Sequence, residues 1–152
     1  MNKYRSATVS VTGHSLGGAV AAIAGQYDLL YRMNAPVVSL INFGGPRVWS
    51  YNASIWVSSL MSSKNVPFNR MVWAKDPVPQ LPTISLGYWH ASTGDSEIWY
   101  PQNSTANAPF VQCHDGPGFE DLSPECSFVS VPLQESDPSD HGWYMGVEHG
   151  CS

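Results

Sequence analysis

Residues 7–18 read ATVSVTGHSLGG, and this stretch decides the fold. Its first half alternates β-branched with smaller or polar side chains, which predicts a short strand over residues 7–12. The glycines from Gly13 to Gly18 predict a tight turn. From Leu16 to about Arg32 helix-forming residues follow, with apolar ones at helical spacing. We therefore expect a strand, a glycine-rich turn and a helix, with Ser15 at the turn.

The next forty or so residues repeat this alternation of strand and helix. A continuous apolar run over Val37–Phe43, ended by Gly44-Gly45-Pro46, predicts a strand that is buried on both faces. A shorter helix is predicted at about residues 51–61 and a third strand over residues 68–74. Strands that alternate with helices imply right-handed parallel crossovers, so the fold class is α/β, with a mainly parallel sheet and flanking helices.

The composition of the sequence changes after Asp76, because five prolines occur between residues 77 and 109. We expect a hairpin that pairs residues 85–90 with residues 96–100, followed by loops up to residue 140. These loops should lie along the edge and at the carboxyl end of the sheet.

Composition and charge narrow the class of protein. The 152 residues are 43% apolar and 12% charged, which favours one soluble domain and excludes collagen, coiled coil and a disordered acidic tail. No apolar run is long enough for a transmembrane segment. Residues 1–75 carry seven basic residues and one acid, a balance of +6, whereas residues 76–152 carry eleven acids and no Lys or Arg, a balance of −11. The basic residues are scattered along the chain, which argues against nucleic-acid binding.

The segment Gly13-His14-Ser15-Leu16-Gly17 fits the G-x-S-x-G pattern of a nucleophile elbow, in which a serine is exposed on a strained turn between a strand and a helix. Glycines two positions before and after the serine give the turn room. The helix N-terminus adds positive dipole beside Ser15, and the Leu16 backbone N–H is the candidate oxyanion donor. The alternative is an ordinary Gly/Ser-rich turn.

A serine hydroxyl needs a base to take its proton, and the base needs an acid to orient it. In proteins with a nucleophile elbow, the order of these residues along the chain is serine, acid, histidine. Asp76 follows the third predicted strand, where the acid belongs, although an aspartate before Pro77 is also typical of a plain turn.

We predict that His141 is the base, because it follows a polar loop and precedes an aromatic segment that would anchor it. His14 lies inside the elbow and is interpreted as a scaffold residue. The remaining histidines, which are alternatives, are His90, His114 and His149. Of these, His90 is more typical of a buried structural residue.

The three cysteines are Cys113, Cys126 and Cys151. A disulfide between Cys113 and Cys126 around an acidic loop would contribute on the order of 3 kcal/mol by chain entropy. The residues from Cys113 to Cys126, which include His114 and several acids, could also suggest a metal site. Their spacing fits neither a zinc nor an EF-hand pattern. We expect no metal and no cofactor.

Two sequons make Asn52 and Asn103 candidate glycosylation sites, as in an exported glycoprotein. No signal peptide follows Met1, because polar residues stand where an apolar core is needed.

Four segments together resemble the class 3 (fungal-type) lipases of the α/β-hydrolase fold. They are residues 11–19 (VTGHSLGGA), 42–48 (NFGGPRV), 76–82 (DPVPQLP) and 140–146 (DHGWYMG), in order over nearly the whole chain. The resemblance implies a secreted ester hydrolase of lipid metabolism, with Ser15 as nucleophile, Asp76 as acid and His141 as base. Its substrates would be acylglycerols or, as in some relatives, feruloyl and other carboxylic esters.

The chain departs from the family at Trp49, where a glycine is usual, and at its beginning, since only fourteen residues precede Ser15. We expect residues 1–152 to be one N-terminally truncated domain, without the early strands, the lid and the loop that supplies the second oxyanion donor. Cys151 would lack its partner, and an exposed sheet edge would favour self-association. The alternative to an active esterase is a non-catalytic fragment.

Overall fold

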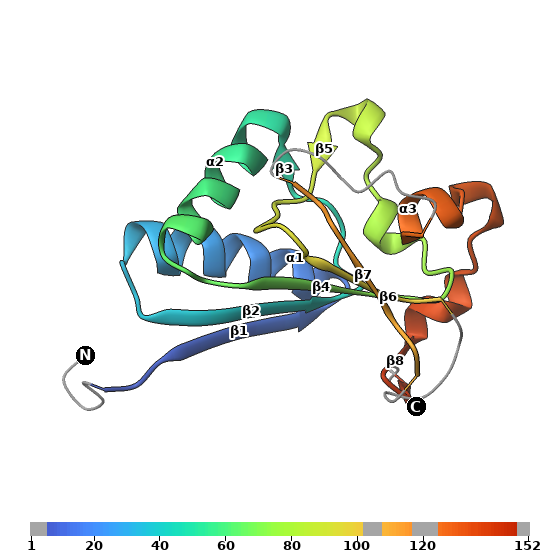
Figure 1. The fold of residues 1–152 in the computed structure, drawn as a ribbon, viewed down its shortest axis with the longest axis horizontal. Helices are drawn as coiled ribbons and strands as arrows, with labels where there is room; N and C mark the ends of the chain where they lie inside the picture. The colour runs from blue at the N-terminus through green and yellow to red at the C-terminus, as the bar shows by residue number, and fades with distance from the viewer. Residues whose placement is uncertain (1–5, 102–107, 117–124, 149–152) are drawn as a thin grey trace.

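The computed structural model describes residues 6–101, 108–116 and 125–148. Its centre is a five-stranded sheet in the order β1-β2-β4-β6-β7 (Figure 1). The first four strands are parallel, and β7 is antiparallel to β6. The bounds are β1 Val9–His14, β2 Val37–Phe43, β4 Phe68–Trp73, β6 Glu97–Tyr100 and β7 Val111–Cys113. The predicted α/β class with a mainly parallel sheet is therefore confirmed.

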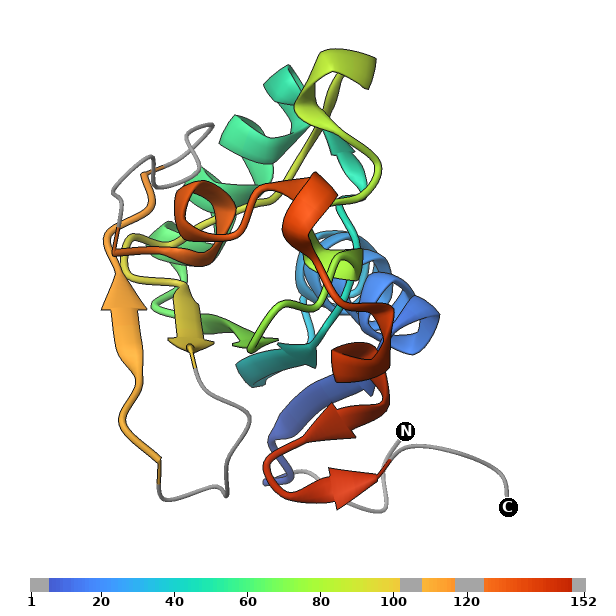
Figure 2. The ribbon, with the colours of Figure 1, turned by 90° about the vertical axis from the view of Figure 1, so that its right-hand side faces the viewer.

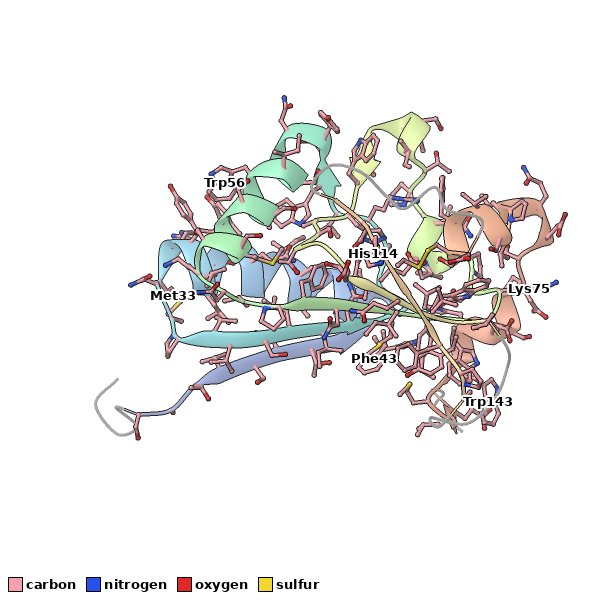
Figure 3. The ribbon with its side chains drawn as sticks, in the orientation of Figure 1. Met33, Phe43, Trp56, Lys75, His114 and Trp143 are labelled. Atoms are coloured by element: carbon pink, nitrogen blue, oxygen red, sulfur yellow. A yellow bond between two sulfur atoms is a disulfide. The ribbon has the colours of Figure 1, made fainter. Side chains whose placement is uncertain are left out.

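The strand register brings the carboxyl ends of three strands together. His14 pairs with Phe43, and Phe43 pairs with Met71. The residues that follow β1, β2 and β4 therefore meet at one edge of the sheet, as expected for parallel strands. Figure 3 shows Phe43, Lys75 and Trp143 toward this end of the molecule, whereas Met33 and Trp56 lie toward the other.

The helices cover one face of the sheet (Figure 2). They are α1 Leu16–Ile23, its continuation η1 Ala24–Arg32, which has π-helical geometry, and α2 Tyr51–Ser63. The core between them and the sheet is apolar and includes Ala22, Leu30, Leu40, Val57, Met61 and Phe68. A Cβ atom on Gly25 would lie 2.3 Å from Leu40 Cδ2, so glycine lets η1 approach β2 closely.

The prediction that residues 37–43 are buried on both faces is wrong. Val37 and Leu40 both lie in the core beneath the helices, whereas Val38 is 45% exposed. The register between β1 and β2 shifts here, since Val9 pairs with Val37 and Ser10 with Ser39, so Val38 falls outside the regular alternation of the strand. Among the described residues, no helix covers the opposite face of β2 at this point.

The predicted hairpin of residues 85–90 with residues 96–100 is also wrong. β5 (Tyr88–Trp89) pairs instead with β3 (Trp49–Ser50), and β6 joins the main sheet between β4 and β7. Trp49, which departs from the family pattern, also donates from Nε1 to Gln26 Oε1 over 2.8 Å. It does not disturb the helix start at Tyr51, where Ser50 Oγ accepts from the Ala53 amide.

In the second half of the chain several short elements accompany β5, β6 and β7, and most of them lie toward the carboxyl end of the sheet (Figure 1). They are η2 Val78–Gln80, η3 Ile84–Leu86, α3 Ser127–Ser130, η4 Leu133–Glu135, η5 Pro138–Gly142, β8 Trp143–Tyr144 and β9 Val147–Glu148. Over the described ranges no helix combines the length and the apolar character that crossing a membrane requires.

Candidate active site

Ser15 lies on a sharp turn between β1 and α1. Its backbone has φ 55° and ψ −128°, a conformation that non-glycine residues rarely adopt. The turn is held by hydrogen bonds from the Ser15 amide to Phe43 O (3.0 Å) and from the Gly18 amide to Ser15 O (2.9 Å). Strain of this kind persists only where the surrounding structure imposes it.

The glycines around Ser15 contribute unequally to this turn. A Cβ atom on Gly13 would lie 2.2 Å from Gly17 O, so a side chain at position 13 is excluded. A Cβ on Gly18 would lie 3.1 Å from Gly45 Cα, which is the close approach of α1 to the loop after β2. A Cβ on Gly17 would meet nothing within 4 Å among the described residues, so the expected need for glycine at position 17 is not supported there.

His141 lies between Ser15 and Asp76. Its Nε2 is 2.7 Å from Ser15 Oγ, and its Nδ1 is 2.9 Å from Asp76 Oδ2. Because an ionised carboxylate only accepts hydrogen bonds, Nδ1 carries the proton and Nε2 is free to accept from the serine hydroxyl. The structure thus brings together the three residues that the sequence proposed as nucleophile, acid and base.

Asp76 lies three residues after the end of β4, and hydrogen bonds hold it there. Its amide donates to Trp73 O over 2.9 Å, and its Oδ1 accepts from the Val78 amide over 2.8 Å. The residue is only 2% exposed, and a buried carboxylate needs such donors to remain charged. The backbone of Lys75 holds the His141 segment beside it, since the Lys75 amide donates to Asp140 Oδ2 and Lys75 O accepts from the Asp137 amide.

A fourth residue, Tyr144, contacts the same carboxylate, although the sequence did not predict this contact. Its hydroxyl donates to Asp76 Oδ2 over 2.5 Å, and its side chain is 1% exposed. Burial, together with the charge of Asp76, raises the pKa of Tyr144 well above its ordinary value, so the hydroxyl keeps its proton. The available signal was only the aromatic pair Trp143-Tyr144 just after His141.

Gly44 makes room for this contact. It has φ +58°, and an added Cβ would lie 2.6 Å from Tyr144 Oη and 2.7 Å from Asp76 Oδ2. Glycine is therefore required both by the backbone and by the packing.

The other histidines lie elsewhere. His90 is buried, and its Nε2 donates to Pro79 O over 2.8 Å. Burial and the charges of Arg70 and Arg47 lower the pKa of His90 well below 6.5, so the ring is neutral. His114 is exposed and contacts Asp95, and His149 lies outside the described residues.

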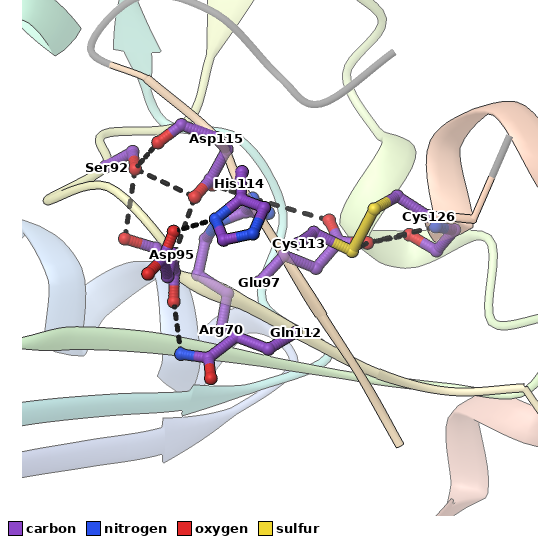
Figure 4. The surroundings of a disulfide bond; sticks show 11 residues. Arg70, Ser92, Asp95, Glu97, Gln112, Cys113, His114, Asp115 and Cys126 are labelled. Atoms are coloured by element: carbon purple, nitrogen blue, oxygen red, sulfur yellow. Dashed lines mark hydrogen bonds and ion pairs between the residues drawn. A yellow bond between two sulfur atoms is a disulfide. The ribbon is translucent and has the colours of Figure 1, made fainter. Parts of the chain in front are cut away.

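Cys113 and Cys126 form the predicted disulfide, which joins β7 to the start of α3 (Figure 4). Beside it, Arg70 contacts Asp115 over 2.6 Å and Glu97 over 3.4 Å. The charge asymmetry of the two halves is thus partly neutralised inside the protein. Burial raises the pKa of Glu97, which Arg70 and the hydrogen bonds from Ser127 oppose.

The remaining predicted positions are placed as follows. Leu16 is the first residue of α1, so its amide belongs to the first turn, where N–H groups have no intrahelical acceptor. Asn52 is exposed near the start of α2, but the serine of its sequon, Ser54, is fully buried. Asn103 and Cys151 lie outside the described residues.

A mainly parallel sheet with a serine on a strand-to-helix turn, and an aspartate and a histidine after later strands, defines the α/β-hydrolase fold. Residues 1–86 match the family described as Lipase (class 3). The chain belongs to the class 3 lipase family.

Its relatives agree in fold and in sequence. A lipase of Caenorhabditis elegans is 33% identical over 97% of this chain and 47% of its own length. A Rhizopus niveus lipase is 33% identical over 93% of this chain and 33% of its own length. The solved triacylglyceride lipase of Rhizomucor miehei superposes with a TM-score of 0.73 at 30% identity, over 97% of this chain and 51% of its own. The chain thus spans a third to a half of these relatives.

Proposed function

We propose that this protein hydrolyses carboxylic esters, with Ser15 as nucleophile, His141 as general base and Asp76 as the acid that orients it. The observation that carries the proposal is the hydrogen-bonded series from Ser15 Oγ to His141 Nε2 (2.7 Å) and from His141 Nδ1 to Asp76 Oδ2 (2.9 Å). One solved relative, 33% identical, is described as a triacylglycerol lipase whose catalytic centre is a serine protease triad.

The geometry supports a two-step acyl transfer. Ser15 Oγ attacks the ester carbonyl while its proton passes to His141 Nε2, and the tetrahedral intermediate collapses as His141 returns that proton to the departing alcohol. Water, activated by the same ring, then releases the acid and restores Ser15. In this proposal the Leu16 amide, in the first turn of α1, donates to the developing oxyanion.

We propose a lipid ester as the substrate. Leu16 and Val20 are 72% and 58% exposed on α1, directly after the nucleophile, and offer an apolar surface to an acyl chain. Relatives in Penicillium and Fusarium are secreted mono- and diacylglycerol lipases. Secretion fits the disulfide of this chain, because such bonds persist in oxidising compartments. Asn52 is exposed and remains a proposed glycosylation site.

A second candidate is a half-domain without activity of its own. It is favoured by the position of β1, which lies at the edge of the sheet within the described residues. An oxyanion site with one donor fewer typically loses about a hundred- to a thousandfold in rate.

The test is labelling of the purified chain by a fluorophosphonate, together with hydrolysis of a short-chain p-nitrophenyl ester. We expect labelling at Ser15 and ester hydrolysis, both abolished in Ser15→Ala and retained in the matched control Ser10→Ala. Labelling at another serine would refute the assignment. Folded protein that neither labels nor hydrolyses the ester would favour the inactive half-domain. Parallel rates on a glyceride emulsion and on a soluble feruloyl ester distinguish lipase from feruloyl-type esterase.

A further inference from the structure

His14, the last residue of β1, contacts the backbone of His141. Its Nε2 lies 3.0 Å from His141 O. Because a carbonyl oxygen only accepts, His14 Nε2 carries the proton and donates it. The two residues are 127 positions apart in the sequence, so this hydrogen bond joins the elbow strand directly to the segment that carries the base.

The two imidazole rings are also stacked. Their centroids are 4.7 Å apart, with 27° between the ring planes. On another side, His14 packs edge-on against the ring of Tyr144, with the centroids 5.3 Å apart. His14 therefore contacts both residues that donate to Asp76 Oδ2, namely His141 and Tyr144.

The His141 segment needs such external support. It lies in η5, a helix of five residues, which is followed by the two-residue strand β8. Elements this short contribute few hydrogen bonds of their own to fix a side chain. The bonds through Lys75 secure the beginning of η5 beside Asp76, whereas the bond from His14 secures the carbonyl of His141 itself.

We propose that His14 is a positioning residue for the active site. It holds both the backbone and the ring of His141, and so fixes the 2.7 Å approach of Nε2 to Ser15 Oγ. His14 itself does not accept the serine proton. Its effect on rate rests on the proposed ester hydrolysis, whereas its effect on the geometry of His141 does not.

The experiment separates the two contacts with three variants. His14→Ala removes both, His14→Gln retains an amide donor in place of Nε2, and His14→Phe retains a ring without a donor. Thr12→Ala, two residues earlier on the same face of β1 and exposed, is the matched control. For each variant we would measure kcat and KM, the rate of fluorophosphonate labelling, and the NMR resonance of the His141 Nδ1 proton in protein labelled with 15N-histidine.

For His14→Ala we expect kcat and the labelling rate to fall about five- to tenfold, the effect of one lost hydrogen bond, with little change in KM. The His141 Nδ1 proton should exchange faster with solvent and lose its downfield resonance. His14→Gln should recover most of the rate and the resonance, His14→Phe less of both, and Thr12→Ala should match the wild type.

Two results would overturn the proposal. One is a wild-type labelling rate and an unchanged Nδ1 resonance in His14→Ala. The other is an equal loss in His14→Gln and His14→Ala together with a changed near-ultraviolet circular dichroism spectrum, since this would mark a general packing role. If the wild type does not label at all, the proposed esterase function fails, but a resonance lost in His14→Ala and retained in His14→Gln still supports the positioning role.

Discussion

Tyr144 and Asp76 form a hydrogen bond of 2.5 Å in the interior, where each residue is at most 2% exposed. The carboxylate thereby accepts from Tyr144 and His141 at Oδ2 and from the Val78 amide at Oδ1. Three donors around a buried carboxylate fix its orientation. An oriented carboxylate in turn selects the tautomer of His141 that leaves Nε2 free to accept.

Replacing Tyr144 with Phe tests the importance of this contact. The change leaves the ring in place but removes one donor to a buried charge, so we expect kcat to fall by about tenfold and stability by about 1–3 kcal/mol. Ester hydrolysis and urea unfolding measure the two effects. Trp143→Phe, at the neighbouring position with 41% exposure, should change neither. Equal activity in Tyr144→Phe and wild type would show that two donors suffice for Asp76.

The elbow glycines offer a matched pair of substitutions. Gly13→Ala places a methyl group 2.2 Å from Gly17 O and should cost about 2 kcal/mol or more, with loss of fluorophosphonate labelling. Gly17→Ala meets nothing within 4 Å and should retain stability, with a gain of up to about 1 kcal/mol from helix propensity. Thermal unfolding and labelling of both variants measure this difference. A destabilised Gly17→Ala would mean that segments outside the described residues pack against this position.

The sequence was sufficient to predict the strand, turn and helix around Ser15 and the parallel strands near residues 37–43 and 68–74, because these elements depend on local signals. The strand before Gly13, the helix after Ser15 and the apolar run at residues 37–43 each have a periodicity that is visible within a few residues. Chain order then favoured Asp76, and the polar loop before His141 with the aromatic segment after it favoured that histidine. The structure places the two residues within hydrogen-bond distance of each other.

Other features depend on partners that are distant in the sequence. Residues 88–89 and 97–100 have strand character, but whether they pair with each other or with β3 and β4 is decided by tertiary packing. Tyr144 reaches Asp76 across 68 residues, and no local pattern marks that contact. The exposure of Val38 likewise depends on the register between β1 and β2.

His90 should make the folded state sensitive to mild acid. Its pKa is lowered by burial and by the charges of Arg70 and Arg47, whereas the unfolded chain titrates near 6.5. Below pH 6.5 the unfolded state therefore binds the additional proton, and the free energy of unfolding falls by up to about 1.4 kcal/mol per pH unit until the folded pKa is reached.

Urea unfolding of wild type and His90→Gln between pH 7.5 and 5 isolates this contribution, because Gln keeps a donor toward Pro79 O but does not titrate. We expect the wild type to lose more stability than the variant as the pH falls. The raised pKa of Glu97 acts in the opposite direction, since it lowers stability as the pH rises above 4.5, and it is common to both proteins. Parallel stability curves would contradict the prediction.

The disulfide should contribute to stability through the unfolded chain. Cys113 and Cys126 are separated by 13 residues, and a loop of that size corresponds to about 3 kcal/mol in the chain-entropy model. We expect the free energy of unfolding of the Cys113→Ala/Cys126→Ala double variant to be lower by that amount, so that it unfolds at a lower urea concentration. Dithiothreitol should lower the unfolding midpoint of the wild type but not that of the variant. Insensitivity of the wild type to dithiothreitol would indicate that the bond is absent or inaccessible.

Over the ranges that the structure describes, β1 is an edge strand, and this edge should make the protein self-associate. Within the described residues β1 pairs only with β2, and α1 and η1 present the apolar side chains of Leu16, Val20, Ile23, Tyr27 and Tyr31, each at least 40% exposed. An unpaired edge beside exposed apolar surface is a template for pairing with another chain. Sedimentation velocity at increasing protein concentration should show growing oligomers. Thr12→Lys, which places a charge on the exposed side of β1, should reduce them, whereas Ser59→Lys, with the same charge change on α2, should not. If both variants associate as strongly as the wild type, the contact lies away from β1.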